Sequence, residues 1–416
     1  MDRSINPSDR EILRKLAARV TEIAALPQME ARRRTWVEHN SLRSPRPMML
    51  VFPEGSWDEL LPASTLSCAG EFARSVEWQL RARIYTYVHF QDDTVVEAEW
   101  TEGPALSDTG WGVTAERHAA PAERGAWSFQ PVVRSEADLR KLHFPELVYD
   151  PAETSRREEQ MSDLFAGLLT VLPFKVRHIS YHLLSQYSSW CGLQEMLTDF
   201  ADRPDFVHRV LSFLEEGHRG VLDQLIAANL LGLNNNATYH SPGGNGYTDQ
   251  LPAPGSDPAR VRPRDMWASA ESQELALVSP RMHDTFALQY EKRLLAPFGL
   301  NGYGCCEDLG RKLEVVFAIP NLRRVSISPF ADVDRCAPQM RDRAIFSWKP
   351  HPAHLVGSFD PAALRAYIRH TLDMCRAHGC FLEMILKDTH TCENHPERFD
   401  IWTQIAREEI RAQGWN

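Results

Sequence analysis

The sequence predicts an α/β protein in which short buried strands alternate with helices, most simply a single (β/α)8 TIM barrel. Eight short apolar runs are separated by mostly helical stretches, and such runs are typical of parallel strands covered on both faces. No Gly-rich dinucleotide or phosphate fingerprint follows the first run, which disfavours the alternative, a doubly wound open sheet. With 416 residues, 43% of them hydrophobic, the chain is long enough for one large barrel with insertions.

The N-terminal part, residues 1–45, is predicted to be a helical extension of this one domain, which spans residues 1–416. Apolar side chains recur at helical spacing over residues 9–26, up to Pro27. The first strand is expected within residues 46–53, an apolar run between prolines. A helix is expected over 71–88, and the β-branched, alternating residues 94–100 predict the second strand.

Residues 101–165 interrupt the alternation of strands and helices. They contain Trp111, Trp127, several Gly and Pro residues and only weak periodicity. We therefore expect an insertion after the second strand, with its own hairpin or as a lid over the active-site mouth. The two tryptophans either stack on an aromatic substrate or pack the insertion against the barrel.

The alternation resumes after the insertion. Further strands are expected at residues 174–180, 232–239, 300–306, 323–329, 344–350 and 382–388, and the clearest helices at 204–229, 280–297 and 360–378.

Composition narrows the classes of function. The chain has 46 basic and 56 acidic residues, a net charge of −10, which argues against a nucleic-acid-binding surface. No apolar stretch approaches the roughly 20 residues that span a bilayer, and the first residues lack the apolar core of a signal peptide. Eight cysteines in a chain of this length indicate reduced thiols rather than a disulfide framework, so we expect a cytoplasmic protein.

The tetrapeptide Cys305-Cys306-Glu307-Asp308 stands where the fifth predicted strand ends. In a barrel this junction faces the active-site mouth. The thiols either pack as structural cysteines or bind a soft metal ion as thiolates. For the second alternative we expect Zn²⁺ held by Cys305, Cys306 and His240, or with a carboxylate of Glu97, Glu99 or Glu307 completing the set.

Other polar residues follow the predicted strands and would meet at the same mouth. Each also has a structural alternative: a hydrogen-bonded core histidine for His178, a rigid loop with an exposed imidazole for His351, and a plain salt bridge for Lys387 and Asp388. The candidate catalytic residues are Glu307, Asp388, Lys387 and Lys349, and the candidate substrate-binding residues are Glu54, Glu99, His178, Asn236 and His351. His182 lies at the same level of the third strand.

Several motifs between about residue 170 and the C-terminus resemble those of one superfamily. They are the stretch 201–210 with its Pro-initiated helix, the strand and proline-bearing loop at 346–355, the Asp360-Pro361 pair and the segment 395–398. In this order they resemble the uroporphyrinogen decarboxylase superfamily. Residues 249–255, 303–307 and 385–388 look most like an uncharacterised branch of it. The resemblance implies a (β/α)8 barrel and, often, a homodimer.

The resemblance does not extend to a true uroporphyrinogen decarboxylase. Such enzymes hold a polyanionic substrate with an arginine-bearing loop after the first strand, whereas residues 52–59 are acidic here. The other large group of the superfamily, the zinc- and corrinoid-dependent methyltransferases, carries a His-x-Cys pair. Here Tyr303-Gly304-Cys305 keeps the cysteine and lacks the histidine.

The resemblance implies a zinc-dependent methyltransferase that moves a methyl group from a small methoxylated or methylthio compound to a corrinoid protein. The alternative is a metal-independent decarboxylase or lyase in which Lys349 or Lys387 holds the carboxylate of a small acid. A third hypothesis is a non-enzymatic barrel that binds a metal or small ligand through the cysteine pair.

Overall fold

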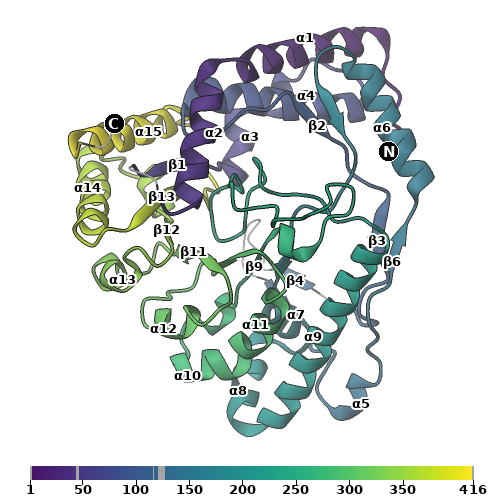
Figure 1. Cartoon of the computed structure of the whole chain (residues 1–416), viewed down its shortest axis with the longest axis vertical. Coiled ribbons are helices and arrows are strands. Elements are labelled where there is room, and N and C mark those ends of the chain that lie inside the picture. Colours follow the sequence, from purple (N-terminus) through teal and green to yellow (C-terminus); the bar gives the residue numbers. More distant parts are fainter. Residues whose placement is uncertain (1, 44–45, 116, 120–126, 415–416) are drawn as a thin grey trace.

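A parallel sheet of seven strands forms the centre of the molecule in the computed structural model, which describes residues 2–43, 46–115, 117–119 and 127–414 (Figure 1). The strand order is β1-β13-β12-β11-β10-β9-β8. The strands are β1 (Met48–Val51), β8 (Ser180–Tyr181), β9 (Trp267–Ala270), β10 (Leu300–Tyr303), β11 (Leu322–Ile327), β12 (Ile345–Trp348) and β13 (Phe381–Leu386).

The first strand of the sheet lies beside the last. β1 pairs with β13 in parallel, with Met48 opposite Glu383, and the other strands follow in chain order. A TIM barrel requires this neighbour relation, so the α/β architecture is compatible with the predicted barrel. The sheet formed by the described residues contains no ladder between β8 and β1.

Helices surround the sheet, and several begin where the sequence places a cap. Asn6 accepts a hydrogen bond from the Asp9 amide at 2.9 Å before α1, and Asp360 caps α14 in the same way at Ala362. The longer helices are α1 (Pro7–Ala24), α2 (Pro27–Asn40), α4 (Glu71–Tyr85), α6 (Pro151–Phe165), α7 (Leu183–Cys191), α8 (Leu193–Asp202), α9 (Pro204–Ala227), α11 (Gln289–Leu295), α13 (Val333–Met340), α14 (Pro361–Ala377) and α15 (Glu397–Ala412); α3 (Trp57–Leu60), α5 (Glu136–Leu139), α10 (Pro280–His283) and α12 (Leu313–Val316) are short.

The predicted second strand is mostly irregular. Only β2 (Glu99–Thr101) is a strand, and it pairs with β7 (Thr170–Leu172) outside the main sheet. The residues before β2 are held beside β1 by hydrogen bonds to side chains. The Asp92 carboxylate accepts the Val51 amide at 2.9 Å, and the Asp93 carboxylate accepts the Met49 amide at 2.9 Å. Side-chain carboxylates thus replace a strand ladder beside β1.

The predicted fourth strand, 232–239, is wrong. Residues 232–239 form no strand: isolated bridges join Val176 to Leu231 and Tyr239 to Asn245, and the strand that continues the sheet is β9. The predicted third strand is reduced to the bridge at Val176 and to β8. Between α9 and β9 the chain makes a long connection that crosses the centre of Figure 1 in teal. Its residues 234–246 include four Asn and three Gly residues, which favour turns over strands.

Part of this long connection packs closely against side chains of β12 and β13. Pro242, Gly243, Gly244 and Asn245 are buried, and a Cβ at Gly243 would lie 1.9 Å from the Ser347 hydroxyl. Glycine is therefore required for the backbone to approach this closely. We call residues 240–247 the inner loop.

A buried ion pair lies beside the inner loop. Arg324 Nε of β11 and Glu383 Oε1 of β13 are 2.9 Å apart, and both side chains are fully buried. α2 reaches the pair from the chain segment before β1: Asn40 accepts a hydrogen bond from Arg324 at 2.6 Å, and His39 Nε2 lies 3.3 Å from Glu383. The N-terminal extension therefore closes the amino end of the sheet.

The insertion at 101–165 contains the expected hairpin. β4 (Arg117–Ala119) pairs antiparallel with β5 (Trp127–Phe129), and β3 (Leu106–Asp108) with β6 (Leu147–Tyr149). Trp111 packs edge-on against Trp190 of α7 at 5.9 Å, and a Cβ at Gly217 of α9 would lie 2.4 Å from its ring. Trp111 thus packs the insertion against the helices; the side chain of Trp127 lies outside the described part.

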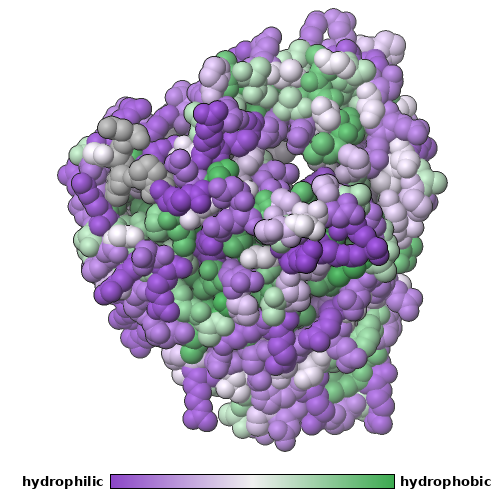
Figure 2. All heavy atoms as spheres, in the orientation of Figure 1, coloured by the Kyte–Doolittle hydropathy of each residue, from purple (hydrophilic) through white to green (hydrophobic). Residues whose placement is uncertain are grey.

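Two hydrophobic cores hold the layers together. The larger joins the sheet to the helices from α7 onward, and the smaller lies under α1, α2 and α4 and includes Leu13, Trp36 and Phe72. Polar residues cover most of the face in Figure 2, with apolar residues in small groups between them. Within the described residues no helix has both the length and the apolar character needed to cross a membrane.

Candidate functional site

The cysteine pair lies directly after β10. Gly304 has φ +93°, a conformation that favours glycine, and there the chain leaves the strand. The Cys305 and Cys306 sulfurs are 3.6 Å apart, both thiols are free, and both residues are half-buried. The Cys305 amide donates to Glu307 Oε2 at 2.8 Å, which fixes the turn. β10 ends at Tyr303, three residues before the predicted strand end, and the helix expected directly after the strand begins only at Leu313, as α12.

Lys387 and Asp388 follow β13 and meet the cysteines across the mouth. Lys387 Nζ lies 3.5 Å from Asp388 Oδ1, and Cys306 Sγ lies 3.9 Å from Asp388 Oδ2. β10 and β13 are separated in the sheet by β11 and β12, so this contact requires a strongly curved sheet. We call Cys305, Cys306, Glu307, Lys387 and Asp388 the thiol cluster.

The charges of the thiol cluster depend on one another. A hydrogen bond in which either sulfur can donate joins the two thiols; it lowers the pKa of the Cys306 thiol and raises that of Cys305. Burial alone would lower the pKa of Lys387, but Tyr239, Cys305 and Asp388 outweigh it and raise that pKa. Cys306 is thus the thiol of the pair that ionises first, beside an ammonium group that stays charged.

Two carboxyl groups of this region hold their protons more tightly than usual. Glu307 is buried, and burial together with the charge of Glu271 raises its pKa. Partial burial and the neighbouring Asp388 raise the pKa of Glu54, which follows β1. Such groups are suited to donate a proton to a substrate.

Lys349 directly follows β12, and the inner loop covers its side chain. It is buried, and its ammonium group donates to the Ser347 carbonyl at 2.9 Å, to the Ser347 hydroxyl at 2.8 Å and to the Pro242 carbonyl of the inner loop. Burial lowers its pKa to about 7. The sequence located its strand correctly but could not show that the inner loop covers it.

The predicted zinc ligands are only partly brought together. A tetrahedral site with Zn–S bonds of about 2.3 Å has edges of about 3.8 Å, close to the separation of 3.6 Å between the two sulfurs. His240 is buried beside Trp267, at 5.2 Å between ring centroids, and its Nε2 has no hydrogen-bond partner among the described residues. In the described part of the chain, no three His, Cys, Asp or Glu side chains are arranged to hold a metal ion.

Other predicted site residues are distributed around the mouth. His178 is exposed, with Nδ1 3.3 Å from the Tyr239 carbonyl oxygen. The His351 ring accepts the Ala353 amide at 3.1 Å and caps a short 3-10 helix, as expected of a rigid loop. Glu99 and Asn236 line a cavity of about 460 Å³ that also contains Arg83 and Arg177, and we call it the basic cavity.

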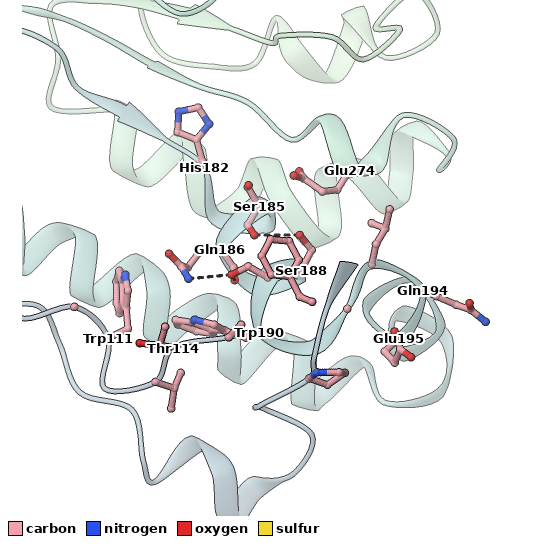
Figure 3. A pocket seen from close by; sticks show the side chains of 18 of the residues that line it. Trp111, Thr114, His182, Ser185, Gln186, Ser188, Trp190, Gln194, Glu195 and Glu274 are labelled. Atoms are coloured by element: carbon pink, nitrogen blue, oxygen red, sulfur yellow. Dashed lines mark hydrogen bonds between the residues drawn. The ribbon is translucent and has the colours of Figure 1, made fainter. Parts of the chain in front are cut away.

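A larger cavity, of about 970 Å³, lies between α7, α8 and the insertion (Figure 3). Trp111 and Trp190 form one side of it, and His182 and Glu274 lie on the other. The described residues that line it include no lysine or arginine. We call it the acidic cavity.

The polar groups of the acidic cavity form an acid–base system. His182 Nδ1 is 2.5 Å from Glu271 Oε1, and this partner outweighs the effect of burial and raises the pKa of His182. Burial and the charge of Glu271 raise the pKa of Glu274 to about 7. Groups with pKa values near neutrality suit proton transfer, and such shifts often mark functional sites.

Sequence reasoning noted His182 but missed Glu271, its hydrogen-bond partner, and Glu274, which lines the acidic cavity. Glu271 and Glu274 follow β9, which was not predicted because Trp267-Ala268-Ser269-Ala270 is short and rich in small residues. The signal available in the sequence was Trp267, followed after a few small residues by two closely spaced glutamates, Glu271 and Glu274.

Comparison with known proteins leaves the family open. No family model matches the chain, and no curated protein matches it. Among solved structures it is similar to a methyltransferase from Methanosarcina mazei, with a TM-score of 0.47 and 9% sequence identity over 89% of this chain and 97% of that one. A likeness this distant carries no conclusion about activity.

Proposed function

We propose that the protein is a methyltransferase that removes a methyl group from a heteroatom of a small methoxylated or methylthio compound. The observation that carries the proposal is the thiol cluster, in which Cys306 lies 3.9 Å from Asp388 across the mouth, beside Lys387. Thiols, an acid and a retained positive charge at the carboxyl ends of barrel-like strands are the groups that such a transfer uses.

The chain's own residues would assist the leaving group. The methyl group passes to an acceptor nucleophile that supplies the new bonding pair, and the heteroatom keeps the electrons of the broken bond. That heteroatom takes a proton from Glu307, whose pKa is raised, while Asp388, paired with Lys387 at 3.5 Å, holds the ammonium group in place. Lys387 stabilises the negative charge that develops there.

The acceptor and the metal belong to the same proposal. We predict as acceptor a corrinoid carried by a partner protein, and we predict a homodimer in the cytoplasm. Zinc would polarise the leaving heteroatom when bound, and Cys305 and Cys306 would hold it. The third ligand, predicted as His240 or a carboxylate, is not in place among the described residues, so no step above depends on zinc.

The test is a demethylation assay. The protein is incubated with a panel of methoxylated and methylthio compounds and cob(I)alamin, and methylated acceptor and demethylated product are measured by mass spectrometry. We expect equal amounts of both, and a large loss of rate in Cys305→Ser/Cys306→Ser and in Asp388→Asn. Cys68→Ser, a buried thiol beneath α1, is the control. No product with any compound, or an unchanged rate in the double variant, rejects the proposal.

The acid–base groups of the acidic cavity favour a second candidate, a metal-independent decarboxylase or lyase acting on a small carboxylic acid, whose carboxylate the protonated ring of His182 would hold. His182, Glu271 and Glu274 supply acid–base groups without a metal. In a decarboxylation the bond to the carboxyl carbon breaks, carbon dioxide leaves, and the electron pair left on carbon takes a proton from Glu274. This candidate predicts activity that survives chelation and the cysteine double variant but is lost in Glu274→Gln.

A further inference from the structure

The basic cavity contains two arginines that no carboxylate neutralises directly. Arg83, from α4, donates through Nη1 to the Glu99 carbonyl oxygen at 2.7 Å. Arg177 makes only long contacts, 3.5 Å to the Lys175 carbonyl and 3.4 Å to the Pro173 carbonyl. No carboxylate oxygen of the described residues lies within 4.0 Å of either guanidinium group.

The carboxylates nearest to this cavity do not balance its charge. Glu97 is already engaged: Arg33 donates to it at 2.9 and 3.1 Å, and the Tyr247 hydroxyl donates to it as well. Glu99 is left as the single carboxylate shared by Arg83 and Arg177. Burial lowers the pKa of both arginines, as expected of cations that lack a close partner. One positive charge is therefore unmatched.

The same cavity has an aromatic wall. Trp57, after β1, and Trp78, of α4, meet edge to face with ring centroids 5.6 Å apart, and both line the cavity. Aromatic rings bind other rings through offset or edge-to-face contacts. A volume of about 460 Å³ is in the range of small-molecule sites.

We propose that the basic cavity binds a small aromatic carboxylate, with the carboxylate at Arg83 and Arg177 and the ring against Trp57 and Trp78. The planar guanidinium fork matches the geometry of a carboxylate, and the carboxylate of the ligand supplies the missing negative charge. The proposal concerns binding alone and does not depend on the methyl transfer proposed for the thiol cluster.

Isothermal titration of the full chain tests the proposal, with benzoate as the probe and benzamide, acetate and phosphate as comparators. We expect benzoate to bind at one site and the comparators at least tenfold more weakly, a difference of about 1.4 kcal/mol. If benzamide binds as tightly as benzoate, the negative charge does not contribute to binding. If acetate or phosphate binds as tightly as benzoate, the aromatic ring does not contribute. Either result, or no binding of benzoate, overturns the proposal.

Variants locate the site. Arg177→Gln and Arg83→Gln should each weaken benzoate binding at least tenfold, Arg177→Lys should weaken it less, and Arg19→Gln, on an exposed part of α1, should leave it unchanged. Glu99→Gln removes the competing carboxylate and should tighten binding several-fold. This variant keeps both arginines, so it decides the matter if an arginine variant fails to fold. Unchanged affinity in Arg177→Gln and Glu99→Gln overturns the proposal.

Discussion

The acidic cavity and the basic cavity have opposite character. The acidic cavity combines His182 with Glu274 and has no lysine or arginine among its described lining residues, whereas the basic cavity contains Arg83 and Arg177. The acidic cavity is lined by Ser180 of β8, by α7 and α8 and by the insertion, and the basic cavity by residues of α4, β2 and β7. Acid–base groups and guanidinium groups therefore lie in separate cavities.

The thiol cluster is linked electrostatically to the acidic cavity. The charge of Glu307 is one of those that raise the pKa of His182. A change of charge at Glu307 should therefore change the titration of His182.

The largest expected effect comes from breaking the buried ion pair beside the inner loop. Arg324→Met leaves Glu383 buried without its partner, which should lower the free energy of unfolding by about 3–5 kcal/mol. Chemical denaturation measures the change. Arg343→Met, at the exposed pair with Glu314, is the control and should cost at most about 1 kcal/mol. Equal effects of the two variants would contradict the role of the buried pair.

The acidic cavity should be recognisable by its pH dependence. The folded pKa of Glu274, about 7, lies above the reference value of 4.5, so the folded state binds more protons between these values. The contribution of Glu274 to the free energy of unfolding is then fully present below pH 4.5 and is lost as the pH rises towards 7. Glu274→Gln should remove this loss. The free energy of unfolding of the variant minus that of the wild type should therefore be about 1–3 kcal/mol larger at pH 8 than at pH 4.

Urea denaturation at the two pH values measures this difference. Glu195→Gln, at another part of the same cavity, serves as the control. An identical pH profile in Glu274→Gln and the wild type would show that Glu274 titrates normally.

The thiol cluster should react more slowly when its positive charge is removed. Lys387 lowers the pKa of Cys306, so Lys387→Gln should reduce the rate of iodoacetamide labelling of Cys306 about 3- to 10-fold at pH 7. Peptide mass spectrometry follows the labelling. Lys141→Gln, in the insertion, should have no effect, and preferential labelling of Cys305 would reverse the assignment of the two thiols.

The smallest effect is expected at His351, which lies away from both cavities. His351→Ala removes a cap and should cost about 0.5–1 kcal/mol of stability. Activity and benzoate binding should stay unchanged, as measured beside a thermal melt. A loss of either would support the prediction that His351 binds substrate.

Local patterns predicted much of this molecule. The apolar runs located β1, β10, β11, β12 and β13, and helical spacing with Pro at the first turn located α9 and α14. The rule that barrel sites lie at the carboxyl ends of strands brought Cys306 and Asp388 to one mouth from residues 82 positions apart. These features follow from periodicity and chain order, which a sequence displays directly.

The sequence by itself determined the alternation of strands and helices and the presence of thiols at a strand end. Only the tertiary structure decided that the inner loop covers Lys349, that β9 brings Glu271 to His182, and that Arg83 and Arg177 share a cavity. The reason is physical: burial and charge balance depend on neighbours distant in the chain, and no local pattern records which neighbours the fold will supply.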